Sequence, residues 1–304
     1  MKLIPMDDRD GFIWFDGKLL PWREAKIHVL SHGLHYGSSV FEGERCYNGQ
    51  VFKLTEHSQR LIKSAEILGF KIPYTVAEID AATKQVVLAQ QLKDCYVRPV
   101  AWRGSEMLGV SAPHSKVHLA IAVWVWASYF TPETKAKGVR LTLAAWRRPA
   151  PDTAPTVSKA AGLYMIATLS KEKAESQGFA DALMLDYRGL VAEATGANVF
   201  FCINGELHTP TPDCFLDGIT RRTIIDLARN RGIKVVERFI HPDEITKAQE
   251  MFLTGTAAEI TPVAELVMPS KTHNFSVGAI TRTMMDDYSR LVRQQPLLSS
   301  ASVA

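Results

Sequence analysis

Lys159 is the residue whose type and setting most strongly suggest chemistry. It lies in "TVSKAAGLYM" (156–165), among small and apolar residues. A lysine ammonium is strongly hydrated and is rarely buried without a partner. In an apolar pocket its pKa falls from the reference of about 10.4, so the neutral amine becomes available to form a Schiff base. A solvated lysine at a helix N-terminus has the same local sequence, so the chemical interpretation depends on partners elsewhere in the chain.

Three later segments supply such partners. Glu193 lies in "VAEATGANVFF", and a carboxylate beside a pyridine nitrogen keeps that nitrogen protonated. Thr220 follows a glycine at the expected start of a helix in "DGITRRTII", where free N–H groups and the helix dipole favour a phosphate. Thr256 and Ala257 follow a predicted strand, and their backbone amides suit a carboxylate or a phosphate. Each segment alone is an ordinary turn or helix cap, but their order and spacing together are informative.

The bulk composition excludes several classes of protein. The 304 residues suit two domains, and the apolar share of 46% and charged share of 22% are those of a globular protein. The net charge of +3, without a run of five Lys/Arg, gives no sign of nucleic acid or a membrane surface as a partner. No signal peptide is visible, and the longest apolar run (119–127) is too short to span a bilayer. The histidines and the four scattered cysteines show no metal-ligand spacing, so we expect no metal and a cytoplasmic location.

Turn and helix signals predict two mixed domains. Asp16-Gly17, Asn48-Gly49 and Asn204-Gly205 each separate two apolar runs and predict hairpins. Apolar spacing predicts helices over about 54–68, 76–92, 160–177, a segment beginning at "GITRRTIIDLARNRG", and a long final helix. The polar, turn-rich segment 127–138 predicts a linker. We therefore expect a small N-terminal α/β domain over 1–130 and a larger C-terminal domain over 131–304.

Seven motifs, in order, resemble those of the fold-type IV pyridoxal-phosphate enzymes and, within them, the branched-chain amino acid aminotransferases. They are "SHGLHYGSSVFEGERCY", "HSQRLIKSA", "YVRPVAWRGSEMLGV", "SKAAGLY", "LDYRGLVAEATGANVFF", "LDGITRRTII" and "FLTGTAAEITPV", which extend over nearly the whole chain. The resemblance implies a D-amino-acid-aminotransferase-like fold with α/β or α+β domains and pyridoxal 5′-phosphate at the domain interface. It also implies a homodimer or a higher homo-oligomer.

The resemblance implies a role for each matching residue around the cofactor. Lys159 would bind the cofactor as an imine and then move the Cα proton, and Tyr164 would hydrogen-bond the 3′-oxygen. Glu193 would pair with the pyridine nitrogen. The phosphate would be held by Arg60, Ile219, Thr220 and Thr256.

The resemblance also implies the substrate site. Thr256 and Ala257, with Tyr96, would hold the α-carboxylate, and Arg98 would contact the γ-carboxylate of glutamate or 2-oxoglutarate. The side-chain pocket would be lined by Tyr36, Phe41, Trp126 and Tyr129 and closed by Leu108 and Val110 of a neighbouring subunit. The implied reaction is ping-pong transamination of L-leucine, L-isoleucine and L-valine with 2-oxoglutarate.

Rival activities of the same fold remain open at this stage. A D-amino acid or (R)-amine aminotransferase is disfavoured because residues 96–120 lack an arginine–x–histidine triplet. The apolar and aromatic residues expected to line the pocket disfavour aminodeoxychorismate lyase. A non-catalytic protein would have to retain Lys159, Tyr164 and Glu193 without using them. The sequence departs from the family pattern at Ala194, where glycine is common, and at Glu44, where an aliphatic residue is common. We expect Ala194 to be tolerated and Glu44 to alter the rim of the pocket.

Overall fold

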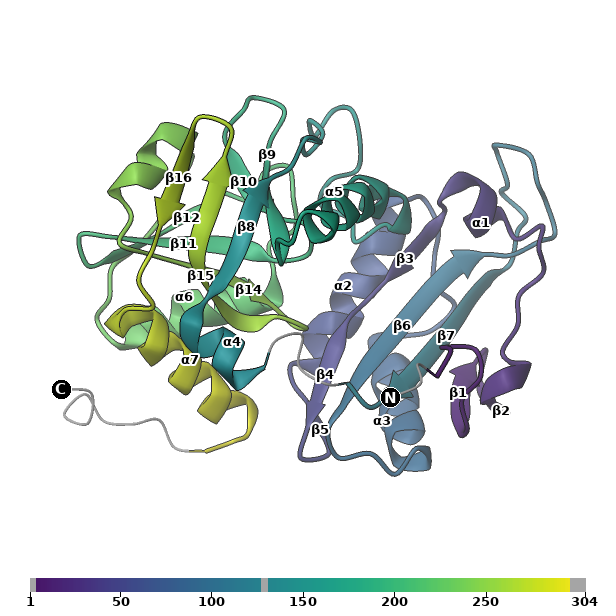
Figure 1. Cartoon of the computed structure of the whole chain (residues 1–304). Coiled ribbons are helices and arrows are strands. Elements are labelled where there is room, and N and C mark those ends of the chain that lie inside the picture. The colour runs from purple at the N-terminus through teal and green to yellow at the C-terminus, as the bar shows by residue number, and fades with distance from the viewer. Residues whose placement is uncertain (1–3, 127–130, 296–304) are drawn as a thin grey trace. The chain divides into compact units, whose positions relative to one another are not determined.

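The computed structural model describes residues 4–126 and 131–295, and the chain folds into two compact units (Figure 1). The first unit comprises Met1–Ala127 and Ser158–Leu163, and the second comprises Ser128–Val157 and Tyr164–Ala304. The segment that carries Lys159 therefore belongs to the first unit, whereas chain order alone assigns it to the C-terminal part. The reason is local, because Ala160 forms a β-bridge with Val40 in the first unit.

An antiparallel sheet forms the first unit. Within the described ranges it has seven strands, in the order β2-β1-β7-β6-β4-β5, with β3 also paired to β6. Their bounds are β1 Phe12–Phe15, β2 Lys18–Pro21, β3 Ser39–Phe41, β4 Glu44–Tyr47, β5 Gln50–Val51, β6 Cys95–Arg103 and β7 Val117–Trp124. The predicted hairpin turns at Asp16-Gly17 and Asn48-Gly49 join β1 to β2 and β4 to β5, and all four turn residues have positive φ. That backbone is the one that two-residue hairpins need.

Two amphipathic helices cover this sheet. α2 (Leu54–Ile67) contacts β3 and β6, and α3 (Val76–Ala89) contacts β1, β7 and α2 (Figure 1). α3 begins at a capping box in which Thr75 and Glu78 satisfy each other's backbone N–H groups. The short helices η1 (Trp22–Glu24) and α1 (His32–Tyr36) connect the early strands. The core between sheet and helices includes Leu61, Ile79 and Val97.

A mixed sheet forms the second unit. Its strands follow the order β10-β9-β8-β15-β14-β11-β12-β13, with β16 on β15, which makes nine strands among the described residues. The pairs β8/β9, β8/β15 and β12/β13 are parallel and the others are antiparallel. The bounds are β8 Val139–Leu143, β9 Asp181–Leu185, β10 Val191–Ala194, β11 Asn198–Ile203, β12 Glu206–Pro210, β13 Val235–Arg238, β14 Glu250–Gly255, β15 Glu259–Met268 and β16 Lys271–Asn274.

The helices of the second unit pack against this sheet. α5 (Met165–Ser176) contacts β9, α6 (Ile219–Asn230) contacts β14, and α7 (Ala279–Val292) contacts β14, β15 and α6. η3 (Pro242–Lys247) connects β13 to β14. The predicted helix over 160–177 is present as a 3₁₀ turn, η2 (Ala161–Tyr164), followed by α5. The predicted linker contains a short helix, α4 (Pro132–Lys137), because Thr131 caps it by accepting from the Thr134 N–H at 3.2 Å.

None of the helices in the described ranges combines the length and the apolar character needed to cross a lipid bilayer.

Two substitutions on α3 test this packing. Ile79 is fully buried, whereas Leu88 of the same helix is 79% exposed. We expect Ile79→Ala to lower the free energy of unfolding by about 2–5 kcal/mol, because it leaves a cavity in the core. Leu88→Ala should change the free energy by no more than about 0.5 kcal/mol. Urea unfolding followed by circular dichroism measures both, and equal losses would contradict this placement of the helix.

Candidate active site

Lys159 is held against the first unit by main-chain contacts. Its backbone N–H donates to the Ser64 hydroxyl of α2 at 3.0 Å, and its carbonyl accepts from the Phe41 N–H of β3 at 3.2 Å. The neighbouring Ser158 hydroxyl donates to the Ser64 carbonyl at 2.9 Å. Because both flanking elements belong to the core of this unit, the half-buried lysine side chain starts from a fixed backbone position.

The ring of Phe41 gathers two cations. The Lys159 amine lies 4.9 Å from the ring centroid, and the Arg98 guanidinium carbon lies 4.7 Å from the same centroid. Both distances are within the range of cation–π attraction. The Phe41 ring therefore contacts both basic side chains, and both are of a type that binds anionic ligands.

Two further residues, Tyr96 and Trp126, extend this group from Arg98. The Arg98 Nη2 donates to the Tyr96 hydroxyl at 3.2 Å, and the Tyr96 ring lies 5.0 Å from the Trp126 ring. A side chain at Gly43 would overlap the Tyr96 hydroxyl, so the glycine leaves room for it. The Arg98 Nε is buried and has no hydrogen-bond partner in the described ranges. The structure thus brings five residues into one connected set, the Phe41 group: Phe41, Tyr96, Arg98, Trp126 and Lys159.

Arg60 is oriented by a buried carboxylate that sequence reasoning missed. Glu42 is fully buried and accepts from the Arg60 Nε at 2.6 Å, from its Nη2 at 2.8 Å, and from the His57 Nδ1 at 2.7 Å. Burial alone would raise the pKa of the Glu42 carboxyl, but Arg60 and His57 outweigh burial and hold that pKa well below its usual range. Burial lowers the pKa of His57, which favours the neutral imidazole. Glu42 is therefore an ionised anchor for the guanidinium.

Glu44, two residues further on, is also a buried carboxyl, but it differs from Glu42 in its partners and in the direction of its pKa shift. It lies directly opposite Val97 of β6, a core residue, so its side chain faces the core and not the rim of a pocket as expected. Glu44 is fully buried, and neither of its oxygens has a hydrogen-bond partner among the described residues. Burial, together with the charges of Glu42 and Asp80, raises the pKa of the Glu44 carboxyl well above its usual value. The protonated, uncharged form is therefore favoured in the folded state.

The remaining predicted substrate residues of the first unit lie at exposed positions. Tyr36 is 47% exposed and packs its ring on His32 of α1 at 4.7 Å, while Leu108 and Val110 lie on the loop between β6 and β7. Within the described ranges, the contacts that join the Phe41 group do not extend to these three. Tyr129 lies outside the described residues.

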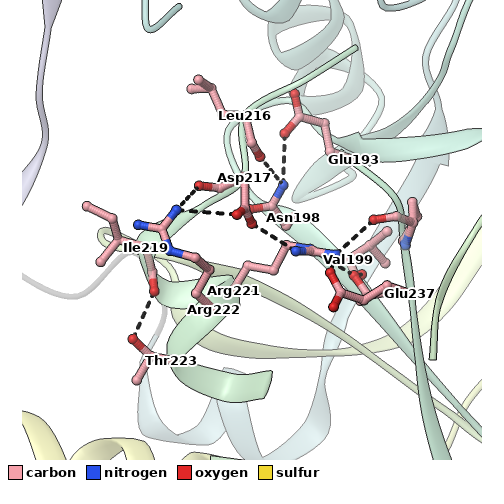
Figure 2. A network of polar contacts seen from close by, with 12 residues as sticks. Glu193, Asn198, Val199, Leu216, Asp217, Ile219, Arg221, Arg222, Thr223 and Glu237 are labelled. Atoms are coloured by element: carbon pink, nitrogen blue, oxygen red, sulfur yellow. Dashed lines mark hydrogen bonds and ion pairs between the residues drawn. The ribbon is translucent and has the colours of Figure 1, made fainter. Parts of the chain in front are cut away.

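In the second unit, Glu193 on β10 has a partner on each oxygen. The Arg148 Nε lies 3.4 Å from the Glu193 Oε1. The Asn198 Nδ2 donates to the Glu193 Oε2 at 3.3 Å (Figure 2). Arg148 and Asn198 are both buried. The two neighbours fix the orientation of the carboxyl group. A carboxylate held in this way suits a ligand that presents a protonated ring nitrogen.

Asn198 also links this carboxylate to the loop before the N-terminus of α6. The Asn198 Nδ2 also donates to the Leu216 carbonyl at 2.9 Å, in the loop that leads into the helix (Figure 2). Gly218 is the N-cap residue and no side chain caps the helix. The first N–H groups, at Ile219 and Thr220, therefore keep their usual suitability for an anion.

A third predicted segment also lies next to Asn198. Asn198 pairs with Thr254 of β14, and this strand ends at Gly255, directly before Thr256 and Ala257. An added Cβ on Gly255 would lie 3.3 Å from the Gly196 carbonyl oxygen, so these two turns are close. The second unit thus assembles Glu193, the start of α6 and the Thr256 turn around one residue. Tyr164 occupies the N-cap position of α5.

Three residues that single-sequence reasoning missed organise these groups: Glu42, Arg148 and Asn198. Glu42 and Asn198 lie within the recognised motifs, but their partners His57, Arg60 and Leu216 lie 15 to 18 residues away in the chain. Arg148 follows a second arginine in "WRRPAP", and nothing in the sequence says which of the two is buried.

Outside this site, Asp186, Asp213 and Cys214 form the one grouping with metal-ligand geometry found in the described ranges. Arg188 lies 2.6 Å from Asp186 and 2.8 Å from Asp213, so an arginine already neutralises the two carboxylates. Burial raises the pKa of the Cys214 thiol to about 12, which disfavours the thiolate that a metal needs. The cluster is therefore a structural ion pair.

Comparison with known proteins gives a consistent picture. The model of the amino-transferase class IV family matches residues 39–266. The branched-chain-amino-acid aminotransferase of Pseudomonas aeruginosa is 43% identical and is matched over 86% of this chain and 87% of its own. The corresponding protein of Escherichia coli K12 is 39% identical, over 83% of this chain and 84% of its own. The resemblance inferred from the motifs is confirmed.

Solved structures agree in fold. The branched-chain aminotransferase of Thermoproteus uzoniensis with norvaline has a TM-score of 0.88 at 36% identity, and covers 93% of this chain and 95% of its own. The branched-chain amino acid aminotransferase of Thermobaculum terrenum in its PLP form has a TM-score of 0.85 at 30% identity, and covers 94% of each chain. The predicted fold class is thereby confirmed.

Substitution of Glu44 tests the buried, uncharged carboxyl beside this site. In the unfolded chain Glu44 ionises at about pH 4.5, whereas the folded protein retains the proton to a higher pH. As the pH rises above about 4.5, the wild type should therefore lose stability relative to Glu44→Gln, by at most about 1.4 kcal/mol per pH unit. Urea unfolding of both proteins between about pH 4 and pH 7 measures this difference.

Glu66→Gln, which removes an exposed carboxyl from α2, controls for the change in net charge. A stability difference between the wild type and Glu44→Gln that stays constant over this pH range would show that Glu44 ionises normally in the fold.

Proposed function

The chain belongs to the class IV amino-transferase family, and on that premise we propose that it transfers the amino group of L-leucine, L-isoleucine and L-valine to 2-oxoglutarate. The products are the branched 2-oxo acids and L-glutamate, and pyridoxal 5′-phosphate is the cofactor. One observation carries the proposal: the reactive lysine of the family's motif shares the Phe41 ring with Arg98.

The donor groups in each unit fit this cofactor. In the second unit, the carboxylate of Glu193 suits the ring nitrogen, and the uncapped N-terminus of α6 suits the phosphate. In the first unit, Lys159 supplies the amine that binds the aldehyde carbon, and Arg60 supplies a guanidinium fixed by Glu42. Tyr164 and Thr256 complete the proposed set as hydrogen-bond donors to the ring oxygen and the phosphate.

The chain's own residues then perform the proton transfers. When bound, the cofactor supplies a conjugated ring that stabilises negative charge at the substrate's α carbon. The substrate amine would displace the Lys159 amine, and the Lys159 Nζ would then accept the Cα proton and deliver it to the carbon of the cofactor's aldehyde group. Glu193 would accept a hydrogen bond from the ring N–H and so keep a proton on that nitrogen. Water would then release the branched 2-oxo acid while its amino group stays behind, and the reverse sequence would pass that group to 2-oxoglutarate as L-glutamate. The Lys159 amine would then bind the aldehyde carbon again.

The Phe41 group explains how one pocket can accept two kinds of side chain. Phe41, Tyr96 and Trp126 offer apolar surface to a branched aliphatic chain. Arg98 lies at the edge of the same surface, with a buried Nε that has no hydrogen-bond partner in the described ranges. We propose that this nitrogen meets the γ-carboxylate of glutamate or 2-oxoglutarate, because a buried donor gains most from a charged acceptor.

A homodimer or higher homo-oligomer completes the proposal. Four large apolar side chains before and within α1 are exposed, at Ile27, Val29, Leu30 and Leu34. Val110, proposed to close the pocket of a neighbouring subunit together with Leu108, is 81% exposed. Apolar surface of this extent favours contact with a second copy. The four cysteines are free, which suits the proposed cytoplasmic location.

Replacing Lys159 tests the cofactor chemistry. The wild-type protein with pyridoxal phosphate should be yellow, and Lys159→Ala should lose both the visible absorbance of the lysine-linked cofactor and all turnover of L-leucine with 2-oxoglutarate. Lys63→Ala, at an exposed position of α2, is the matched control and should keep both properties. A wild-type protein that stays colourless and inactive with added cofactor would refute the proposal.

A substrate panel tests the specificity. L-Leucine, D-alanine and an (R)-arylamine are each supplied with a keto acceptor, and kcat/KM is measured for each. We expect L-leucine to give the highest value, because the pocket surface is aromatic and its polar edge carries Arg98. A faster reaction with D-alanine or with the amine would assign the chain to the corresponding rival activity.

A further inference from the structure

Asn198 joins two parts of the second unit that have different proposed tasks. Its side chain is 5% exposed and its Nδ2 makes two hydrogen bonds, one to Glu193 and one to the carbonyl of Leu216 (Figure 2). A primary amide has two N–H groups, so these two bonds use its full donor capacity. One small, buried group therefore contacts both the carboxylate of β10 and the loop before α6.

On the side of the carboxylate, the contact is specific to one oxygen. Asn198 donates to the Glu193 Oε2 at 3.3 Å, while Arg148 lies 3.4 Å from the Oε1. Arg148 and Asn198 thus both help to orient the Glu193 carboxyl group. The Arg148 backbone N–H donates to the Leu185 carbonyl of β9 at 2.8 Å, which holds Arg148 beside that strand.

On the side of the helix, Asn198 controls the approach of the chain to α6. Besides the bond to Leu216 at 2.9 Å, its Oδ1 lies so close to Gly218 that a Cβ there would overlap it. Gly218 has φ −63° and ψ 138°, which an alanine also adopts, so the glycine is needed for space and not for its backbone angles. The amide of Asn198 therefore sets how the N-terminus of α6 lies relative to β11.

We propose that Asn198 is a positioning residue that couples the ring-nitrogen end of the cofactor site, at Glu193, to its phosphate end, at the N-terminus of α6. The inference rests on the proposed use of pyridoxal phosphate. A rigid ligand that touches both ends requires a fixed separation between them, and a shared hydrogen-bonding group maintains that separation. Occupation of one end then favours binding at the other, and the coupling is reciprocal.

Two probes, each smaller than the cofactor, measure binding at the two ends of the site independently. Pyridoxal carries the ring and the aldehyde but no phosphate, and its binding is followed by visible absorbance. Inorganic phosphate binds only the phosphate end, and its dissociation constant is measured by competition with pyridoxal phosphate. Both are applied to the full chain freed of bound cofactor, for the wild type and for each variant.

We expect Asn198→Ala to weaken both probes. The dissociation constant of pyridoxal should rise by about tenfold to hundredfold, because the Glu193 carboxyl group, whose side chain is 12% exposed, loses a hydrogen-bond donor. The dissociation constant of inorganic phosphate should rise by about fivefold, because the loop before α6 loses its bond at Leu216. Arg148→Gln is the matched control, since the Arg148 side chain contacts Glu193 and, within the described ranges, makes no hydrogen bond or ion pair with this loop. It should weaken pyridoxal and leave the phosphate constant unchanged.

Gly218→Ala tests the same coupling from the opposite end. This residue lies at the phosphate end, and its added methyl group would displace the Asn198 amide without removing any donor. We therefore expect Gly218→Ala to raise the dissociation constant of pyridoxal, although pyridoxal carries no phosphate. This second variant also keeps the test decisive if Asn198→Ala fails to fold, which circular dichroism reports.

Two outcomes overturn the inference. One is an unchanged phosphate constant in folded Asn198→Ala, and the other is unchanged pyridoxal binding in Gly218→Ala. The proposed function fails in a different way, since the wild-type chain would then bind neither pyridoxal nor pyridoxal phosphate through Lys159.

Discussion

The hydrogen bond from the Phe41 N–H to the Lys159 carbonyl is the contact on which the arrangement of the first unit depends. It joins β3, near the start of the chain, to the segment Ser158–Leu163, which follows all other residues of this unit in the sequence. Ser64 adds a second anchor from α2. A lysine side chain has four flexible bonds, so its reach is defined only if its backbone is fixed. With that backbone fixed, the amine lies over the Phe41 ring together with Arg98.

Neighbouring carboxyls in this unit show how partners, rather than burial, decide the charge. Glu42 and Glu44 are two residues apart and equally buried, yet the pKa of one is lowered and that of the other is raised. Glu42 has a guanidinium and an imidazole as donors, whereas Glu44 faces the apolar core beside Val97. The ionised carboxyl therefore orients a cation, and the protonated one only fills space, at a cost in stability that depends on pH.

Much of the secondary structure is determined by local sequence, and that part of the fold could be predicted. The Asp-Gly and Asn-Gly turns require positive φ and so identify hairpins, while the motifs around Lys159, Glu193 and Thr220 identify the family. What sequence reasoning missed involves long-range contacts. The burial of Arg148 and the hydrogen bonds from Asn198 to Leu216 and from Arg60 to Glu42 depend on how distant segments meet. Glu44 looked like a pocket residue because strand register, which decides its face, is not visible in one sequence. Tyr164, Thr256 and the other assigned roles remain predictions from the motifs.

The return of Ser158–Leu163 to the first unit has a consequence for the modularity of the chain. A fragment that ends near residue 130 would lack the segment that pairs with β3 and would leave the Phe41 N–H and the Ser64 hydroxyl without their native partners. Its complement would carry Lys159 on a segment detached from the strand and helix that hold it. The two units are therefore compact without being separable genetic modules. Exchange of one unit between related chains would require two junctions flanking the lysine segment in addition to the one near residue 130.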